Sequence, residues 1–408
     1  MKNNLNKIIS LVYLFTGSSF AQISSLHPHD TGIQNHPLVL FAEMFEQSSI
    51  PTMTSANWNA ISSVTSNILF DASVPPGSLG TQSLRLKTIE TGTTSNEPDE
   101  DTYIYKKLNS NINDSVFVRF YIKYDNATCF HHSGVWMGGK NPPSNTPGNQ
   151  AGVAPLGNQA FHVGAEVRGA VNSGSVSTAT FGFYNYWMNM HASSQTNTAT
   201  SQPYYWGNEF FNSTSNDDLN TSNWNCIEVM VKLNNPVTAY NGELALWVNG
   251  IKISHYGYQF PNGTWNYSQF TEGAGTPFEG YQWRNSSALG FNYLWLKNYA
   301  TNFNVMGHVG NTYIDHLVVA KGYIGPIALS TDLKESSEVK NTLKLFPNPT
   351  NQLLNFSEVV NGYEVYDMIG KKIMSQKLPS KNLSTENLVE GVYIIHANNM
   401  AIKFVVKH

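Results

Sequence analysis

The sequence predicts an all-β protein: an antiparallel β-sandwich or jelly roll followed by a small C-terminal β-sandwich domain. Three observations support this prediction. Charged residues make up only 13% of the 408 residues, against about 25% in ordinary globular chains, so long helices lack side chains for their exposed faces. Aromatic residues reach 12%, whereas disordered chains are poor in aromatics. Short runs with period-two alternation recur between Gly, Asn and Pro turns.

The charge and hydropathy patterns exclude two classes of partner. The formal net charge is -4, which provides no basic surface for nucleic acid. No apolar run reaches the roughly 18 residues that a membrane span needs. We therefore expect no nucleic-acid partner and no transmembrane segment.

Residues 1–21 have the pattern of a secretory signal peptide. Lys2 and Lys7 supply the positive region, residues 8–15 form a short apolar run, and Ser19-Phe20-Ala21 offers a cleavage site. A first core helix fits this stretch poorly, because nothing polar alternates with the apolar run. We expect residues 1–21 to be removed during export.

The region 22–327 is predicted to be one large β domain. VFVRFYIKY (116–124) and FHVGAEVR (161–168) alternate apolar and polar side chains, and residues 226–233, 243–248 and 313–320 are further strand candidates. Asn249-Gly250 separates ELALWV from IKISHY, a strong signal for a two-residue hairpin. The rhythm of short strands and turns favours a sandwich or jelly roll.

The last part of the chain has its own pattern. Residues 328–342 are polar and free of aromatics, which indicates a linker. Residues 343–408 contain Phe346-Pro347-Asn348-Pro349, Tyr366-Asp367 with Gly370-Lys371, Gly391-Val392-Tyr393 and a basic end. This ordered set resembles the C-terminal sorting domain of the type IX secretion system of Bacteroidetes. The resemblance implies a secretion machinery as partner, and a location outside the cell or at its surface after export through the periplasm.

The central region has a second resemblance. The stretches WNCIEVMVKLN, GELALWVNGIKISHY and YIDHLVVAKGYIGPI, which end at residue 327, look like concanavalin A-like lectin and glucanase jelly rolls. In that superfamily a concave sheet forms a carbohydrate groove, and secreted lyases that act on alginate, ulvan and glucuronan share the architecture. Aromatic, basic and amide side chains cluster in residues 129–140, 161–169 and 181–191. Such a mixture suits a glycan site, because sugars stack on rings and hydrogen-bond through hydroxyls.

The carboxylates leave a hydrolase unsupported without excluding it. Glycosidases need two carboxyl groups about 5–10 Å apart. The retaining jelly-roll glucanases carry Glu-x-Asp-x-x-Glu on one strand, a spacing that this sequence lacks. Glu228 alternates with Ile227 and Val229, so its side chain could point into the groove.

A polysaccharide lyase fits the residue types better. It removes the C5 proton of a uronic acid and expels the 4-linked glycosyl oxygen, and the sugar carboxylate must be neutralised. A Tyr or a neutral His acts as base, and Tyr returns the proton. The predicted catalytic residues are His132, Arg168, Tyr184 and Tyr186. The predicted substrate-binding residues are Arg119, Lys123, Trp136, His162, Glu166, Trp206 and Arg284.

Structural interpretations of the same residues stay open. Arg168 could pair with Glu166, two positions away on the same face, and Tyr184 and Tyr186 could form a packed aromatic ladder. Cys129 and Cys226 are compatible with a disulfide in an exported protein, but two buried thiols fit the same count. The cofactor is unknown. A calcium ion is compatible with a jelly roll, but no loop has an obvious oxygen-ligand spacing.

Three functions follow from this pattern. The first is a secreted lyase that cleaves an alginate- or ulvan-type uronate polysaccharide by β-elimination. The alternatives are a non-catalytic carbohydrate-binding protein, which would use the same groove without turnover, and a glycoside hydrolase with unrecognised carboxylates.

Overall fold

A computed structural model shows two compact units, residues 1–331 and 332–408. It describes residues 22–89, 100–125, 132–148, 151–168, 178–211, 218–220, 222–300, 309–329, 343–367, 372–398 and 400–408. The predicted signal peptide (1–21) and most of the predicted linker lie outside these ranges. The domain boundaries drawn from the sequence therefore stay predictions.

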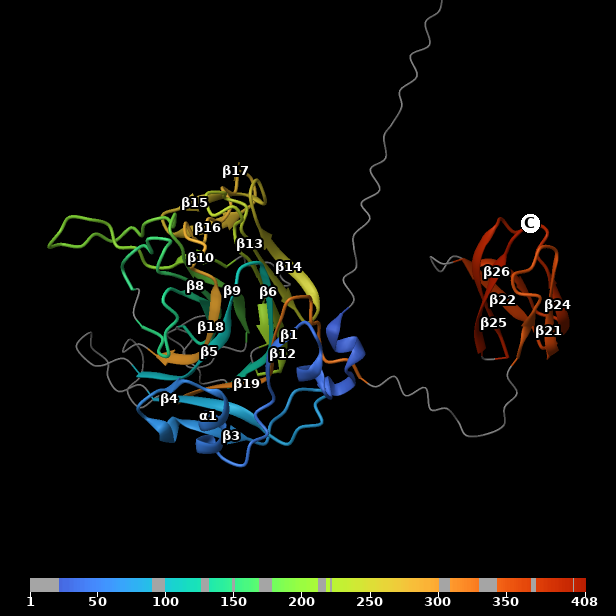
Figure 1. Cartoon of the computed structure of the whole chain (residues 1–408), viewed down its shortest axis with the longest axis horizontal. Coiled ribbons are helices and arrows are strands. Elements are labelled where there is room, and N and C mark those ends of the chain that lie inside the picture. Colours follow the sequence, from blue (N-terminus) through green and yellow to red (C-terminus); the bar gives the residue numbers. More distant parts are fainter. Residues whose placement is uncertain are drawn as a thin grey trace, which may run out of the picture. The chain divides into compact units, whose positions relative to one another are not determined.

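The larger unit is built from two sheets, as the sequence predicts (Figure 1). The first is an antiparallel sheet of eight strands among the described residues. Its strands in spatial order are β14 (Ile251–Tyr256), β13 (Glu243–Val248), β12 (Asn225–Lys232), β6 (Ser115–Tyr124), β19 (Val309–Ala320), β4 (Ser83–Ile89) and β3 (Ile68–Asp71), with β1 (Val39–Glu43) paired to β19. The Asn249-Gly250 hairpin joins β13 to β14 with φ values of 50° and 84°, the left-handed backbone that this turn needs.

The second sheet has eleven strands among the described residues. They are β17 (Thr276–Pro277), β15 (Asn262–Asn266), β16 (Gln269–Glu272), β10 (Asn208–Phe210), β9 (Thr178–Tyr186), β8 (Ala160–Arg168), β7 (Gly134–Lys140), β18 (Phe291–Ala300), β5 (Glu100–Ile112) and β2 (Ala60–Ile61), with β11 (Asp218–Asn220) paired to β9. Its pairs are antiparallel except for β10 with β16. We call the face of each sheet that points away from the other sheet its outer face.

The core lies between the two sheets. Val118, Phe120 and Ile122 of β6 are fully buried, and so are Phe161 and Val163 of β8. The rings of Phe120 and Phe181, from opposite sheets, have centroids 6.4 Å apart. Period-two alternation therefore sends one set of side chains into this core and the other set to the outer faces.

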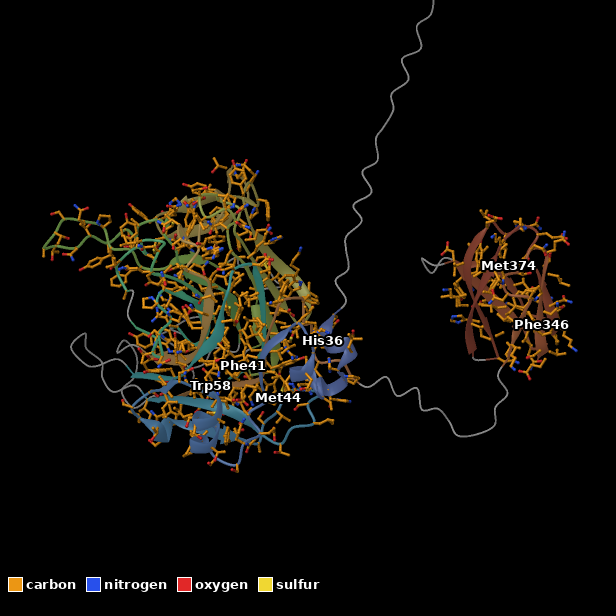
Figure 2. All side chains as sticks on the ribbon, viewed as in Figure 1. His36, Phe41, Met44, Trp58, Phe346 and Met374 are labelled. Carbon is orange, nitrogen blue, oxygen red and sulfur yellow. The ribbon has the colours of Figure 1, made fainter. Side chains whose placement is uncertain are left out.

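The N-terminal segment packs on the sheet of eight strands. It contains three short 3₁₀ helices, η1 (Ile23–Leu26), η2 (Pro28–Asp30) and η3 (Ile33–Asn35), and the helix α1 (Ile50–Asn57); η4 (Thr65–Asn67) precedes β3. The Ser49 side chain caps α1 by accepting from the Thr52 N–H at 3.3 Å. Trp58, which follows α1, meets the Phe41 ring edge to face at 6.0 Å (Figure 2).

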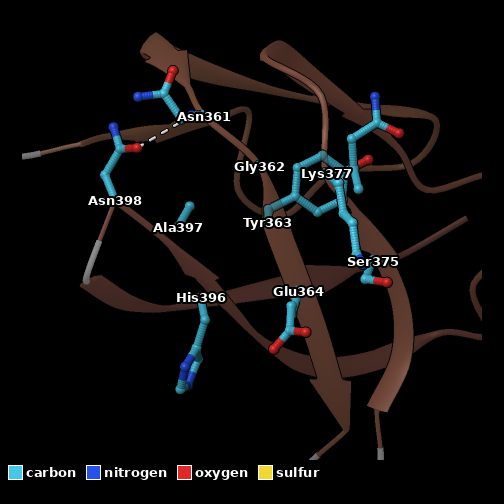
Figure 3. Close-up of a pocket in the computed structure, with 10 residues that line it drawn as sticks. Asn361, Gly362, Tyr363, Glu364, Ser375, Lys377, His396, Ala397 and Asn398 are labelled. Carbon is cyan, nitrogen blue, oxygen red and sulfur yellow. Dashed lines mark hydrogen bonds between the residues drawn. The ribbon is translucent and has the colours of Figure 1, made fainter.

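The smaller unit is a β-sandwich with its own core. One sheet contains β20 (Leu345–Phe346), β21 (Leu353–Val360) and β24 (Ser380–Ser384). The other contains β23 (Lys372–Gln376), β22 (Tyr363–Asp367), β25 (Gly391–Ala397) and β26 (Met400–Val406). Leu354, Phe356 and Val365 are among its fully buried residues. A pocket of about 610 Å³ in this unit is lined mainly by polar residues, including Asn361, whose N–H donates to the Asn398 side chain (Figure 3).

Within the described part of the chain, none of the helices is both long and apolar enough to span a membrane.

Candidate functional site

The outer face of the sheet of eleven strands gathers most of the predicted site residues. His162, Gly164, Glu166 and Arg168 alternate with buried Phe161, Val163, Ala165 and Val167 along β8. The register pairs Gly164 with Tyr184 on β9 and with Trp136 on β7, and it pairs His162 with Tyr186. Residues paired across a sheet share a face, so these side chains lie together. The alternation seen in FHVGAEVR was sufficient to predict this face.

His132 is held by a carboxylate at the end of this cluster. Its Nδ1 lies 2.9 Å from Glu166 Oε1, and Trp136 Nε1 donates to Glu166 Oε2 at 2.8 Å. A carboxylate only accepts hydrogen bonds, so Nδ1 carries the imidazole proton and Nε2 is the basic nitrogen. His132 has a φ of 57°, a conformation that is often found where a functional side chain must be aimed.

A missing side chain on β8 makes room for Trp136. A Cβ added to Gly164 would lie 2.7 Å from Trp136 Cε2, so the indole lies directly over the backbone of β8. The His132 ring meets the Trp136 ring edge to face, with centroids 5.4 Å apart. Gly164 therefore fixes the position of Trp136, and Glu166 fixes its orientation.

Tyr184 and Tyr186 complete the cluster as protonated phenols. The rings of His132 and Tyr184 have centroids 4.6 Å apart, and the Tyr184 and Tyr186 rings meet edge to face at 5.7 Å. Burial raises the pKa of both phenols. These tyrosines are therefore suited to donate a proton, while the imidazole is suited to accept one.

Two lysines on this face were missed by sequence reasoning. Lys297 of β18 is 6% exposed, and its Nζ lies 4.1 Å from the Trp295 ring centroid and 5.1 Å from that of Trp136. Lys140 of β7 lies over the rings of Tyr105 and Tyr293, and burial lowers its pKa to about 8. The alternation Tyr293, Trp295, Lys297, Tyr299 in FNYLWLKNYA could have identified the first of them.

His162 extends the cluster toward Tyr293. Its Nδ1 contacts the Tyr293 hydroxyl, and its ring meets Tyr186 at 6.1 Å. Burial, with a contribution from Lys140, lowers the pKa of His162 to about 3, so the imidazole stays neutral in ordinary conditions. Its Nε2 is buried without a hydrogen-bond partner among the described residues. A buried ring nitrogen of this kind is a polar group that the protein itself leaves unsatisfied.

Arg168 lies at the edge of the same face, in a more exposed position. Its side chain is 51% exposed and forms an ion pair with Glu209 of β10. Glu166 instead binds His132 and Trp136, so the alternative pairing of Arg168 with Glu166 is wrong. The aromatic-ladder interpretation of Tyr184 and Tyr186 describes their contacts correctly, and it does not exclude a chemical role.

Three predicted residues belong to the other sheet, which corrects the prediction that they line the same groove. Arg119 of β6 is fully buried and pairs with Asp30 at 2.6 Å. Lys123 binds Ser73 Oγ at 2.6 Å and lies over the Tyr313 ring. Glu228 of β12 accepts from the N–H groups of Ile324 and Gly325, and burial raises its pKa to about 7. Their alternation was predicted correctly, but it cannot show which sheet a strand joins.

Arg284 and Trp206 lie outside the cluster. Arg284 is 3% exposed and donates to the carbonyl oxygens of Leu289 and Asn113, so it fastens a loop. Trp206 stacks on Tyr204 at 5.0 Å in the segment between β9 and β10, and its sugar-binding role stays a prediction.

The described cysteine and acidic residues form no metal site. Cys226 is a buried free thiol, and Cys129 lies outside the described residues. In the ranges that the structure covers, no group of three or more His, Cys, Asp or Glu side chains is arranged to hold a metal ion.

Comparisons with known structures match this fold at low similarity. The marine alginate lyase from Aplysia kurodai is 12% identical with a TM-score of 0.41, over 69% of this chain and 98% of that one. The endo-β-1,4-glucuronan lyase from Trichoderma reesei is 10% identical with a TM-score of 0.37, over 69% and 95%. A laminarinase from Flavobacterium is 8% identical with a TM-score of 0.33, over 69% and 100%. No curated protein matches the sequence.

The C-terminal region has a direct family match. Residues 344–408 match the secretion system C-terminal sorting domain, which confirms the sorting tail predicted from the Pro-Asn-Pro motif and the later glycines. Its presence implies export to the cell surface or the medium, while transit through the periplasm stays a prediction. Residues 344–408 are thus a sorting domain of the type IX secretion system, and the larger unit to which it is joined in sequence consists of two mainly antiparallel β-sheets.

Proposed function

We propose that the protein is an exported lyase that cleaves a uronate-containing polysaccharide by β-elimination. The observation that carries the proposal is the His132–Glu166 pair, which faces two protonated tyrosines on a sheet face that also holds three cationic side chains. β-Elimination needs a base, an acid and a positive charge beside the sugar carboxylate. The outer face of the sheet of eleven strands supplies all three.

In this mechanism His132 removes the C5 proton. Nδ1 is fixed against Glu166 at 2.9 Å, so Nε2 accepts the proton and the carboxylate stabilises the imidazolium that forms. Tyr184 then protonates the departing glycosyl oxygen, because its raised pKa keeps the phenol protonated until a strong base develops beside it. The C5–H and C4–O bonds break while a C4–C5 double bond forms.

The cations neutralise the substrate carboxylate. Arg168 is half-exposed and can exchange its ion pair with Glu209 for a fork of hydrogen bonds to a uronate. Lys297 places a second positive charge beside Trp136 and Tyr299. A neutral glucan has no negative charge to pair with these cations, which favours a uronate polymer over an uncharged one.

The hydrolase alternative has weaker support. Glu166 is 4% exposed and its two oxygens already hold His132 and Trp136, while Glu209 pairs with Arg168. Glu166 is therefore not available as an acid or nucleophile, which leaves Glu209 without a free second carboxyl of this pair. A binding protein uses the same face without turnover, and activity alone separates it from a lyase.

The test is incubation of the full chain with alginate, ulvan and glucuronan, read by the ultraviolet absorbance of the unsaturated uronate product. We expect absorbance to rise with at least one polymer. Reducing ends without this absorbance would indicate a hydrolase, and binding without either product would indicate a carbohydrate-binding protein.

Arg168→Ala tests the assignment of the carboxylate-neutralising group. We expect turnover to be lost with little change in melting temperature, since an exposed ion pair is worth at most about 1 kcal/mol. Arg85→Ala is the matched control, because Arg85 also forms a partly exposed ion pair, with Asp71 on the other sheet. Full activity of Arg168→Ala on an established substrate would remove Arg168 from the mechanism.

A further inference from the structure

A second group of reactive side chains lies on the other sheet, at the edge of the N-terminal segment. His316 Nε2 lies 2.8 Å from Ser78 Oγ, and His316 Nδ1 lies 2.6 Å from Asp30 Oδ2. The three residues come from the loop before β4, from β19 and from η2. A serine, a histidine and an aspartate joined in this order have the geometry of a nucleophile, its base and the group that orients the base.

The backbone around these residues is strained. His316 has a φ of 47° and lies where the pairing of β19 with β6 shifts register, between Asp315 and Val318. His29 and Asp30 have φ values of 57° and 58°. Left-handed backbone is costly for residues other than glycine, and it clusters where function requires a particular aim. Two of these residues, Asp30 and His316, belong to the hydrogen-bonded chain, and His29 directly precedes Asp30.

Buried contacts keep Asp30 ionised and oriented. Burial favours the neutral acid, but Arg119 and His316 outweigh it and lower the pKa of Asp30. Arg119 Nη2 binds the same oxygen, Oδ2, that His316 Nδ1 contacts, and both the Arg119 and Asp30 side chains are almost completely buried. An ionised Asp30 accepts a hydrogen bond from the Nδ1–H group of His316. Nε2 of His316 is therefore the nitrogen that can take the proton of Ser78.

Ser78 lies on a tight, well-fastened turn. Gly77 before it has a φ of 86°, and the Gly77 carbonyl oxygen contacts His29 Nδ1 at 2.7 Å. The N–H groups of Thr81 and Gln82 donate to Glu46 Oε1 at 2.9 and 3.2 Å. Ser78 is partly exposed and Leu79 is 70% exposed. A nucleophile here is reachable from solvent, while its base is buried behind it.

We propose that Ser78, His316 and Asp30 form a second active site that hydrolyses carboxylic esters. Ser78 Oγ attacks the ester carbonyl carbon while its proton moves to His316 Nε2. The C–O bond to the alcohol breaks, and His316 returns the proton to the departing alkoxide. Water then attacks the acyl-serine while His316 Nε2 takes its proton. The bond between the acyl carbon and Ser78 Oγ breaks, His316 gives the proton to Oγ, and the carboxylic acid leaves.

The surroundings favour small acyl esters. The N–H of the residue after a nucleophile, Leu79 here, is a usual donor to the oxyanion. Esters need less help in expelling the leaving group than amides do, which suits a site with so few donors. An O-acyl group on a sugar would be such a substrate. The site lies on the sheet that does not carry the His132 cluster, so it is independent of the proposed lyase activity.

The experiment is covalent labelling of the full chain with a fluorophosphonate probe, followed by mass analysis of the peptide that contains Ser78. We expect an adduct on Ser78 of the folded protein. Hydrolysis of p-nitrophenyl acetate should fall at least about a hundredfold in Ser78→Ala, because this variant removes the nucleophile. Cleavage of polysaccharide should be unchanged in this variant.

Ser73→Ala is the matched control. Ser73 Oγ lies in the same loop and binds Lys123 Nζ at 2.6 Å, and among the described residues it has no hydrogen bond to a histidine. Labelling and ester hydrolysis should persist in this variant. If the folded wild-type protein forms no adduct on Ser78, or Ser78→Ala hydrolyses the ester as fast as wild type, the three residues only fasten the N-terminal segment and the proposal is overturned.

Discussion

The outer faces of the two sheets of the larger unit carry similar residue types, but the polar side chains on the two faces differ in their partners. On the sheet of eight strands, Arg119 binds Asp30 and Glu228 binds two backbone N–H groups, and the N-terminal segment and residues 324–325 provide these partners. On the sheet of eleven strands, Lys297 Nζ lies over the rings of Trp136, Trp295 and Tyr299. On the same face, His162 Nε2 is buried without a hydrogen-bond partner among the described residues.

The difference shows how covering segments decide the role of a polar side chain. A buried charge with a partner stabilises the position of the segment that supplies the partner, and removing either group is costly. Polar groups that the protein itself leaves only partly satisfied are suited to a bound molecule. Variants on both faces can test this contrast, because one set should change stability and the other should change activity.

The largest expected effect is on the sheet of eleven strands. His132→Ala removes the proposed base, so the rate of polysaccharide cleavage should fall about a hundredfold to ten-thousandfold. His255→Ala is the matched control, because His255 also binds a glutamate, Glu243, at 2.8 Å but lies on β14 of the other sheet. Initial rates of product absorbance measure the effect. Equal losses in both variants would show that the cluster around His132 is not the site.

The second effect is on the stability of the sheet of eight strands. Arg119→Ala leaves the Asp30 carboxylate buried without its cation, which should lower the free energy of unfolding by about 3–5 kcal/mol. All nine tryptophans lie between residues 58 and 295, so tryptophan fluorescence in urea reports the larger unit alone. Arg168→Ala should lose at most about 1 kcal/mol. Similar losses in the two variants would contradict the contrast between the faces.

The third effect concerns the position of Trp136. Gly164→Ala places a Cβ 2.7 Å from Trp136 Cε2 and should displace the indole from β8. A displacement of about 1 Å at a site can reduce the rate roughly a hundredfold. Gly322→Ala, whose Cβ would lie 3.4 Å from Leu38 Cδ1, is the control. An unchanged rate in Gly164→Ala would mean that Trp136 plays no part in positioning.

The smallest effect is a pH dependence of stability that arises on the outer face of the sheet of eight strands. Burial raises the pKa of Asp315 from 3.8 to about 8. The folded state then binds more protons than the unfolded state between these values, so stability falls as pH rises through this window. Asp315→Asn should flatten the fall in urea midpoint between pH 4 and pH 8. A slope in Asp315→Asn equal to that of the wild-type protein would contradict the assignment.

Local patterns were sufficient for much of the fold. Period-two alternation located β6, β8, β12 and β13 to within a residue or two, and Asn249-Gly250 located a hairpin turn. Alternation also placed His162, Glu166 and Arg168 on one face, because successive side chains of a strand must point to opposite sides. The Pro-Asn-Pro motif located the sorting domain, which carries its own turn and strand signals.

The ion-pair partners of polar side chains could be identified only from the tertiary structure. Arg119 and Arg168 look alike in the sequence, but the first is buried against Asp30, which is 89 residues away along the chain, and the second is half-exposed beside Glu209. The sequence by itself determined which side chains share a face of each strand, because that depends only on the backbone period. The tertiary structure alone decided which sheet each strand joins and which segment covers it, because these depend on contacts between residues far apart in the chain.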